Sequence, residues 1–182
     1  SNVDFTPLTD DLAVFLLCGE QNMIGQASGA KSYPTEDLIY QYKHSTYASD
    51  PTDTTIHQVT TGPLDHNGET ASTHGVINKF SELLRDNSFF TGRKIVFIPM
   101  AKDDAGFSDN EWTVGGNAYN DAVGATNLIL NTYTQATFEG IIWIGGETDY
   151  QNNLYAEKLL QTIQKMRQDI YVGTSSFHSL SL

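Results

Sequence analysis

The sequence is poor in cysteine and in positive charge. Its 182 residues include a single cysteine, Cys18, so no disulfide can form within the chain. Lysine and arginine together number 10, against 22 aspartate and glutamate residues, which gives a formal net charge of −12. A chain this acidic repels phosphate backbones and anionic lipid, so we expect no nucleic-acid partner. The cysteine count does not decide in which cellular compartment the protein works, because a domain of this size can build a sufficient core without disulfides.

Long hydrophobic runs and sequence motifs for metals or nucleotides are also missing. The longest apolar runs, at 12–18, 95–101 and 140–146, are much shorter than the ~20 residues that span a bilayer, so no membrane insertion is expected. The sequence has no Walker loop, no cysteine–histidine cluster, no Asn-x-Ser/Thr acceptor and no internal repeat. We therefore predict neither a metal nor a cofactor. Because the chain begins with Ser1 and shows no signal-peptide pattern, we expect that an earlier part of the product was removed.

The residues that are present suit one globular domain over 1–182. Hydrophobic residues make up 39% of the chain, which is enough for a core. Continuous apolar runs predict strands buried on both faces of a parallel sheet, at 12–18, 94–99, 140–145 and 169–173. Apolar residues at helical spacing predict helices over 72–85, 117–135 and 152–168. This alternation predicts an α/β fold, a three-layer α/β/α sandwich around a mostly parallel sheet.

Residues 24–72 interrupt this alternation. The stretch is rich in Ser, Thr, Gly, Asp and Tyr, and it contains His44, His57 and His66. We predict a long irregular insertion, with one short strand at 39–42. An irregular stretch of this length inside a compact domain is usually functional or peripheral.

The predicted parallel sheet indicates where a site would lie. In such sheets, ligands bind at the carboxyl ends of the strands. Three predicted loops leave those ends, at 19–25, 102–116 and 145–150. We therefore expect any site to be assembled from these loops.

Two motifs stand in these loops. Gly19-Glu-Gln-Asn-Met23 follows the first strand, and Trp143-Ile-Gly-Gly-Glu-Thr-Asp149 closes the third. Together they resemble the G-Q-S-N-M and W-x-Q-G-E-S-D motifs of the sialate O-acetylesterase-like carbohydrate esterases, a branch of the SGNH hydrolases. Gly75 matches the family's glycine that opens a helix. The resemblance runs from about Ala13 to Phe177 and implies an SGNH-hydrolase-like, flavodoxin-like fold.

The same resemblance implies that catalytic groups are missing. The family's nucleophilic Ser falls on Gln21, whose amide has no hydroxyl to deprotonate. Its oxyanion-donating Gln falls on Gly145, whereas its glycine donor is kept as Gly75. Its closing Asp-x-x-His block has no match, because the last histidine, His178, has Ser175 three residues earlier. We therefore expect a fold cut short at its carboxyl end, without ester hydrolysis.

The candidate pocket consists of residues near the ends of the first and third strands and near residue 75. Its members are Gly19, Glu20, Gln21, Asn22, His74, Gly75, Gly146, Glu147, Asp149 and Trp112. Gln21 either binds a ligand through its amide or satisfies neighbouring backbone groups. Glu147 and Asp149 either act as acid and base, hold a cation, or tie adjacent loops together, and the last role is favoured.

Four further features each have two interpretations. Trp112, with Tyr119 nearby, either stacks on a sugar ring or packs in the core. His74, expected at the start of a helix, is either a residual base or a capping or surface residue. Cys18 is a weak candidate for a replacement nucleophile, because a thiol in an apolar strand is usually inert. The acidic loop residues bind calcium or are merely solvated; they are Asp103, Asp104, Asp109 and Glu111.

Three functions remain open at this stage. The leading hypothesis is a catalytically degenerate carbohydrate-esterase-like module for glycan recognition or a structural role, bound to other chains of a larger secreted or phage virion assembly. The second is an active carbohydrate O-acetylesterase that residues outside this chain complete. The third is a purely structural virion or scaffold domain. We favour an extracellular or virion-associated location, by analogy with the places where such domains occur.

Overall fold

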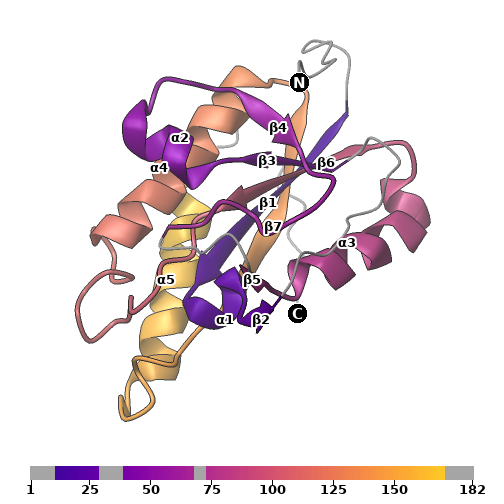
Figure 1. Cartoon of the computed structure of the whole chain (residues 1–182). Helices are drawn as coiled ribbons and strands as arrows, with labels where there is room; N and C mark the ends of the chain where they lie inside the picture. The colour runs from indigo at the N-terminus through magenta and orange to yellow at the C-terminus, as the bar shows by residue number, and fades with distance from the viewer. Residues whose placement is uncertain (1–10, 29–38, 68–72, 171–182) are drawn as a thin grey trace.

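A five-stranded sheet forms the centre of the molecule (Figure 1). This computed structural model describes residues 11–28, 39–67 and 73–170. The strand order is β4-β3-β6-β1-β7. The bounds are β1 Leu12–Gly19, β3 Ile39–Tyr42, β4 Ile56–Gln58, β6 Lys94–Pro99 and β7 Ala136–Ile144. β1 is parallel to β6 and β7, and β6 to β3, whereas β4 is antiparallel to β3. The prediction of a mostly parallel sheet is confirmed.

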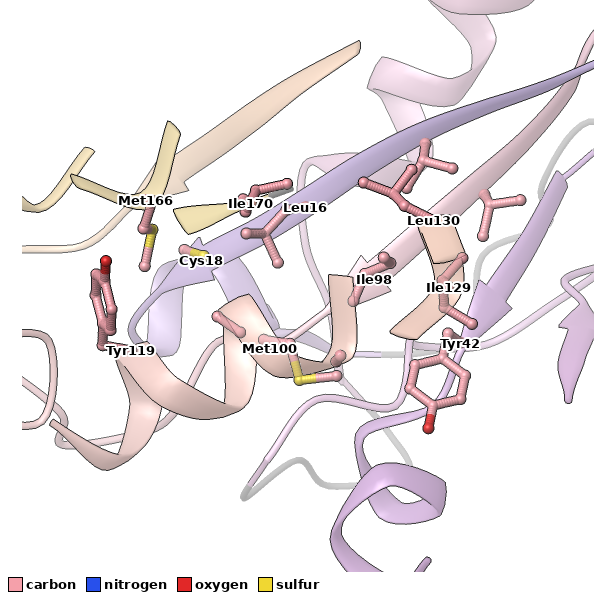
Figure 2. Close-up of a cluster of buried hydrophobic side chains, with 14 of the residues drawn as sticks. Leu16, Cys18, Tyr42, Ile98, Met100, Tyr119, Ile129, Leu130, Met166 and Ile170 are labelled. Atoms are coloured by element: carbon pink, nitrogen blue, oxygen red, sulfur yellow. The ribbon is translucent and has the colours of Figure 1, made fainter. Parts of the chain in front are cut away.

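Helices cover both faces of this sheet. α4 (Asn117–Thr132) and α5 (Tyr155–Asp169) pack on one face, and α3 (Ile77–Asp86) packs on the other. Side chains alternate along β1, so that Leu16 and Cys18 face α4 and α5, as Figure 2 shows, whereas Leu17 faces the α3 side. The predicted three-layer α/β/α sandwich is therefore confirmed. None of the described helices is long and apolar enough to cross a membrane.

The 24–72 stretch is more regular than we predicted. The short strand at 39–42 is confirmed as β3, and α2 (His44–Ser49) and β4 follow it. β2 (Ala27–Ser28) pairs with β5 (Thr73–His74) in a separate antiparallel ribbon. Sequence patterns missed these elements because they are short and mostly polar, and in β4 only Ile56 is buried. The prediction of one irregular insertion is wrong for these parts.

Several predicted boundaries also shift. α3 begins at Ile77 rather than at 72, because residues 73–74 pair with β2 instead of entering the helix. α5 begins at Tyr155 rather than at 152, because the backbone forms a turn from Asp149 onward. Asp169, predicted to begin a fourth strand, is the last residue of α5, and 171–173 lie outside the described residues. The short η1 (Ser88–Phe90) precedes β6, and α1 (Gln21–Ile24) follows β1.

Candidate functional site

The three predicted loops do meet at the carboxyl edge of the sheet. The Lys102 N–H donates to the carbonyl oxygen of Gly19 at 3.1 Å, and the Glu20 N–H donates to the carbonyl oxygen of Ile144 at 2.9 Å. Gly19 has a φ of +119°, and a Cβ there would lie 1.8 Å from the Ile144 carbonyl oxygen. Only glycine therefore allows this close approach of the two strand ends.

Glu20 ties the end of β1 to the loop after β7. Its side chain is buried, with 2% of the residue exposed. The carboxylate accepts hydrogen bonds from the N–H groups of Gly146 at 2.7 Å and Thr148 at 2.9 Å, and also from the Thr148 hydroxyl. Because this carboxylate already accepts three hydrogen bonds, its role is to hold the loop after β7 against the end of β1.

Glu147 and Asp149 make comparable ties. Glu147 Oε1 accepts from the N–H of Asn22 in α1 at 2.8 Å. Asp149 is buried and accepts from the N–H groups of Phe107 at 2.6 Å and Ser108 at 3.0 Å, and from the Ser108 hydroxyl. Burial alone would raise the Asp149 pKa, but these hydrogen bonds lower it overall. The geometry supports the interpretation that these carboxylates tie adjacent loops together.

Gln21 is the first residue of α1, and its side chain is exposed. Its Oε1 accepts a hydrogen bond from Gln26 Nε2 at 2.8 Å. The amide therefore pairs with a neighbouring amide rather than with buried backbone groups. Each amide of such a pair has further donors and acceptors that can meet a ligand.

Two glycines lie close to the start of α1 or to α1 itself, and a third lies beside Tyr155 of α5. A Cβ on Gly75 would lie 2.8 Å from the Met23 carbonyl oxygen, so Gly75 lies directly against α1. A Cβ on Gly145 would lie 3.1 Å from the Glu20 nitrogen, and Gly146 has a φ of +119° with the Tyr155 ring beside it. His74 lies in β5, paired with Ala27, so the expectation that it stands at a helix start is wrong.

Trp112 is not part of this surface. Its side chain is completely buried, and its ring meets that of Trp143 edge to face with centroids 5.0 Å apart. Its carbonyl oxygen accepts from the Thr162 hydroxyl of α5 at 3.0 Å. Of the two interpretations of Trp112, packing in the core is therefore the one that the structure supports, and Trp112 does not line a pocket.

Cys18 and the acidic loop offer no reactive or ion-binding arrangement. Burial raises the pKa of the Cys18 thiol, which keeps the thiol protonated and inert. Glu111 pairs with Lys102 at 2.7 Å, and Asp109 accepts from the Gly106 N–H at 3.0 Å. Among the described residues, no group of three or more His, Cys, Asp or Glu side chains is arranged to hold a metal.

Sequence reasoning missed two features of this edge. Tyr150, directly after Asp149, is 80% exposed. His66 is buried, and its Nδ1 accepts from the Ala101 N–H at 3.1 Å. Burial lowers the pKa of His66 to about 3. The polar residues that follow Tyr150 in the sequence are the one local sign that its side chain is exposed. Nothing local in the sequence indicates that His66 is buried.

A mostly parallel sheet between helical layers, with strand-end loops tied by the buried carboxylates of Glu20 and Asp149, defines an SGNH-hydrolase-like α/β domain. The chain belongs to the family described as carbohydrate esterases, sialic acid-specific acetylesterases, which its sequence matches over residues 11–177. A search of curated proteins finds no match.

Solved structures share this fold at low sequence identity. A protein from Arabidopsis thaliana aligns over 87% of this chain with a TM-score of 0.62 and 16% sequence identity. NanS aligns over 90% of this chain with a TM-score of 0.67 and 16% sequence identity. A carbohydrate acetylesterase from Xanthomonas citri aligns with a TM-score of 0.50 and 17% identity over 86%. The alignments cover 69%, 63% and 38% of those three chains, respectively.

Proposed function

We propose that this chain is a carbohydrate-esterase-like module that recognises glycans and does not hydrolyse acetyl esters. The observation that carries the proposal is Gln21. It stands at the carboxyl end of β1, where the family motif has its nucleophilic serine, and its side chain pairs with that of Gln26. A primary amide cannot form the acyl-enzyme on which this type of hydrolysis depends.

The surrounding residues support the same proposal. Gly145 has no side chain with which to stabilise an oxyanion, so of the two oxyanion donors that the family motif implies only the backbone N–H of Gly75 is retained. The carboxylates of Glu20 and Asp149 each accept several hydrogen bonds within the fold. A carboxylate occupied in this way is poorly placed to take a proton from a nucleophile.

An active carbohydrate O-acetylesterase is the second candidate, favoured by one observation. Gly75 is retained and lies against α1, beside the former nucleophile position. Such an enzyme would need another nucleophile, and a base supplied by residues outside this chain. A purely structural domain is the third candidate, and it predicts no glycan binding.

A place in a larger secreted or virion assembly is part of the proposal, and copurification with its neighbouring chains would test it.

Two measurements separate these candidates. Intact mass after incubation with a fluorophosphonate probe should show no adduct on the chain, and a covalent adduct would overturn the proposal. A glycan array should show reproducible binding, whereas its absence would favour the structural domain. Circular dichroism on the same sample confirms that the chain is folded.

A further inference from the structure

A rigid loop presents one exposed aromatic ring at the rim of the candidate site. Asp149 is 3% exposed, whereas the next residue, Tyr150, is 80% exposed. The turn that follows is fixed, because the Asn152 N–H donates to the Asp149 carbonyl oxygen at 2.7 Å and the Leu154 N–H donates to Asn152 Oδ1 at 3.0 Å. A ring held on a fixed backbone loses little conformational entropy when it binds a ligand.

Half of the exposed residues in two segments, 19–28 and 145–154, carry carboxamides. We call this set the amide rim: Gln21, Asn22, Gln26, Gln151 and Asn153, all of them exposed. Gln151 Nε2 donates to the Tyr150 hydroxyl at 3.0 Å. A hydrogen bond from the Asn22 N–H to Glu147 holds α1 against the loop that carries Tyr150.

Positive charge is missing from both segments. Residues 19–28 and 145–154 contain no Lys or Arg, in a chain of net charge −12. The acids in these segments are Glu20, Glu147 and Asp149, and each already accepts a hydrogen bond from a backbone N–H. A sugar that carries a carboxylate would therefore meet acids but no cation from these two segments.

Amides and an aromatic ring together fit one class of ligand. Carboxamides both donate and accept, as the hydroxyl groups of a sugar require. The face of a tyrosine ring offers a flat apolar surface to the C–H face of a pyranose. We propose that Tyr150 and the amide rim bind the pyranose ring of an uncharged glycan. This inference rests on the proposed glycan recognition and specifies its ligand class and its stacking residue.

The test compares three variants on a glycan array that carries neutral hexosides, with and without O-acetyl groups, beside sialosides. The affinity for the neutral hexoside that gives the strongest signal is then measured by titration. Tyr150→Ala should weaken binding about tenfold, the upper range for an aromatic contact. Tyr150→Phe should bind like the unmodified chain, because the ring is retained. Phe89→Ala removes another exposed aromatic ring, outside both segments, and should leave the affinity for the hexoside unchanged.

The outcomes separate this inference from the proposed function. If the unmodified chain binds neutral glycans and Tyr150→Ala binds them equally well, the assignment of Tyr150 is wrong although glycan recognition holds. Binding confined to sialosides would contradict the ligand class alone. If no glycan binds a folded sample, both the proposed recognition and this inference fail.

Discussion

The Glu20 carboxylate accepts hydrogen bonds from both the backbone N–H and the hydroxyl of Thr148, a residue 128 positions further along the chain. This contact fastens the carboxyl end of β1 to the loop after β7. The family motif has glutamine at this position, whereas this chain has a buried glutamate. The site therefore uses a carboxyl group, rather than an amide, to hold the loop that carries Glu147, Asp149 and Tyr150.

Replacing Glu20 by glutamine should destabilise the fold. The amide NH₂ would face N–H and O–H donors that now find an acceptor, so at least one of these part-buried donors would lose its partner. We expect the free energy of unfolding in urea to fall by about 1–3 kcal/mol. Glu157→Gln, which changes an exposed glutamate of α5, is the matched control. If both variants have the same midpoint of urea unfolding, the hydrogen bonds to Glu20 contribute nothing to stability.

Gly19→Ala tests the close approach of β1 and β7. The substitution combines a positive φ with a Cβ 1.8 Å from the Ile144 carbonyl oxygen, a backbone atom that cannot rotate away. A strained residue costs about 1–3 kcal/mol, and the clash adds to this cost. Gly140→Ala in β7 meets no atom within 4 Å and serves as the control. Thermal unfolding of the two variants should differ by several degrees, and a Gly19→Ala melting temperature like that of the control would refute the close approach.

Acid should destabilise the protein through His66. Burial lowers the pKa of His66 from 6.5 to about 3, and burial lowers the pKa of His44 as well. The unfolded chain therefore binds more protons than the folded chain at pH values between these limits, so stability is lost as pH falls below 6.5. Each such histidine contributes a slope of up to about 1.4 kcal/mol per pH unit.

The variant His66→Gln isolates this contribution. Glutamine can still accept a hydrogen bond from the Ala101 N–H, yet it does not titrate. Urea unfolding between pH 5 and 7 should give a shallower dependence of stability on pH for the variant than for the unmodified chain. Identical slopes would mean that His66 is not held neutral in the fold.

Cys18 should react with a thiol reagent only after unfolding. The thiol is completely buried, and burial raises its pKa, so access and ionisation are both suppressed. Absorbance after addition of an aromatic disulfide should show slow labelling in buffer and one fast equivalent in denaturant. Rapid labelling of the folded chain would contradict the burial of this strand and would revive Cys18 as a nucleophile.

The positions of β1 and β6 could be predicted from the sequence because buried parallel strands are continuous and apolar. The run at 94–99 has the bounds of β6, and the run at 12–18 differs from β1 by one residue. The strand predicted at 140–145 begins earlier, at Ala136, and it is only partly buried because β7 lies at the edge of the sheet. Short polar elements such as α2 could not be predicted, because tertiary contacts rather than local patterns stabilise them. The sequence pattern predicts too early a start for α3 for a similar reason, since the pairing of β5 with β2 is a non-local contact.

The candidate site was predictable in outline only. The strand-end rule correctly brought the loops at 19–25, 102–116 and 145–150 together. It did not indicate which side chains those loops would bury. Trp112 is a candidate from the sequence because it is a large aromatic in a strand-end loop, yet it lies in the core, whereas Tyr150 of the same edge is exposed. Exposure depends on how the loops pack, which local sequence does not encode.

Acetate release is the most direct test of the central claim that Gln21 leaves this module without esterase activity. The unmodified chain, a Gln21→Ser variant and a buffer blank would be assayed with an aryl acetate and with acetylated sugars, after circular dichroism confirms folding. We predict no acetate release above the blank from the unmodified chain. Turnover by that chain would contradict the account and would show that another residue is the nucleophile.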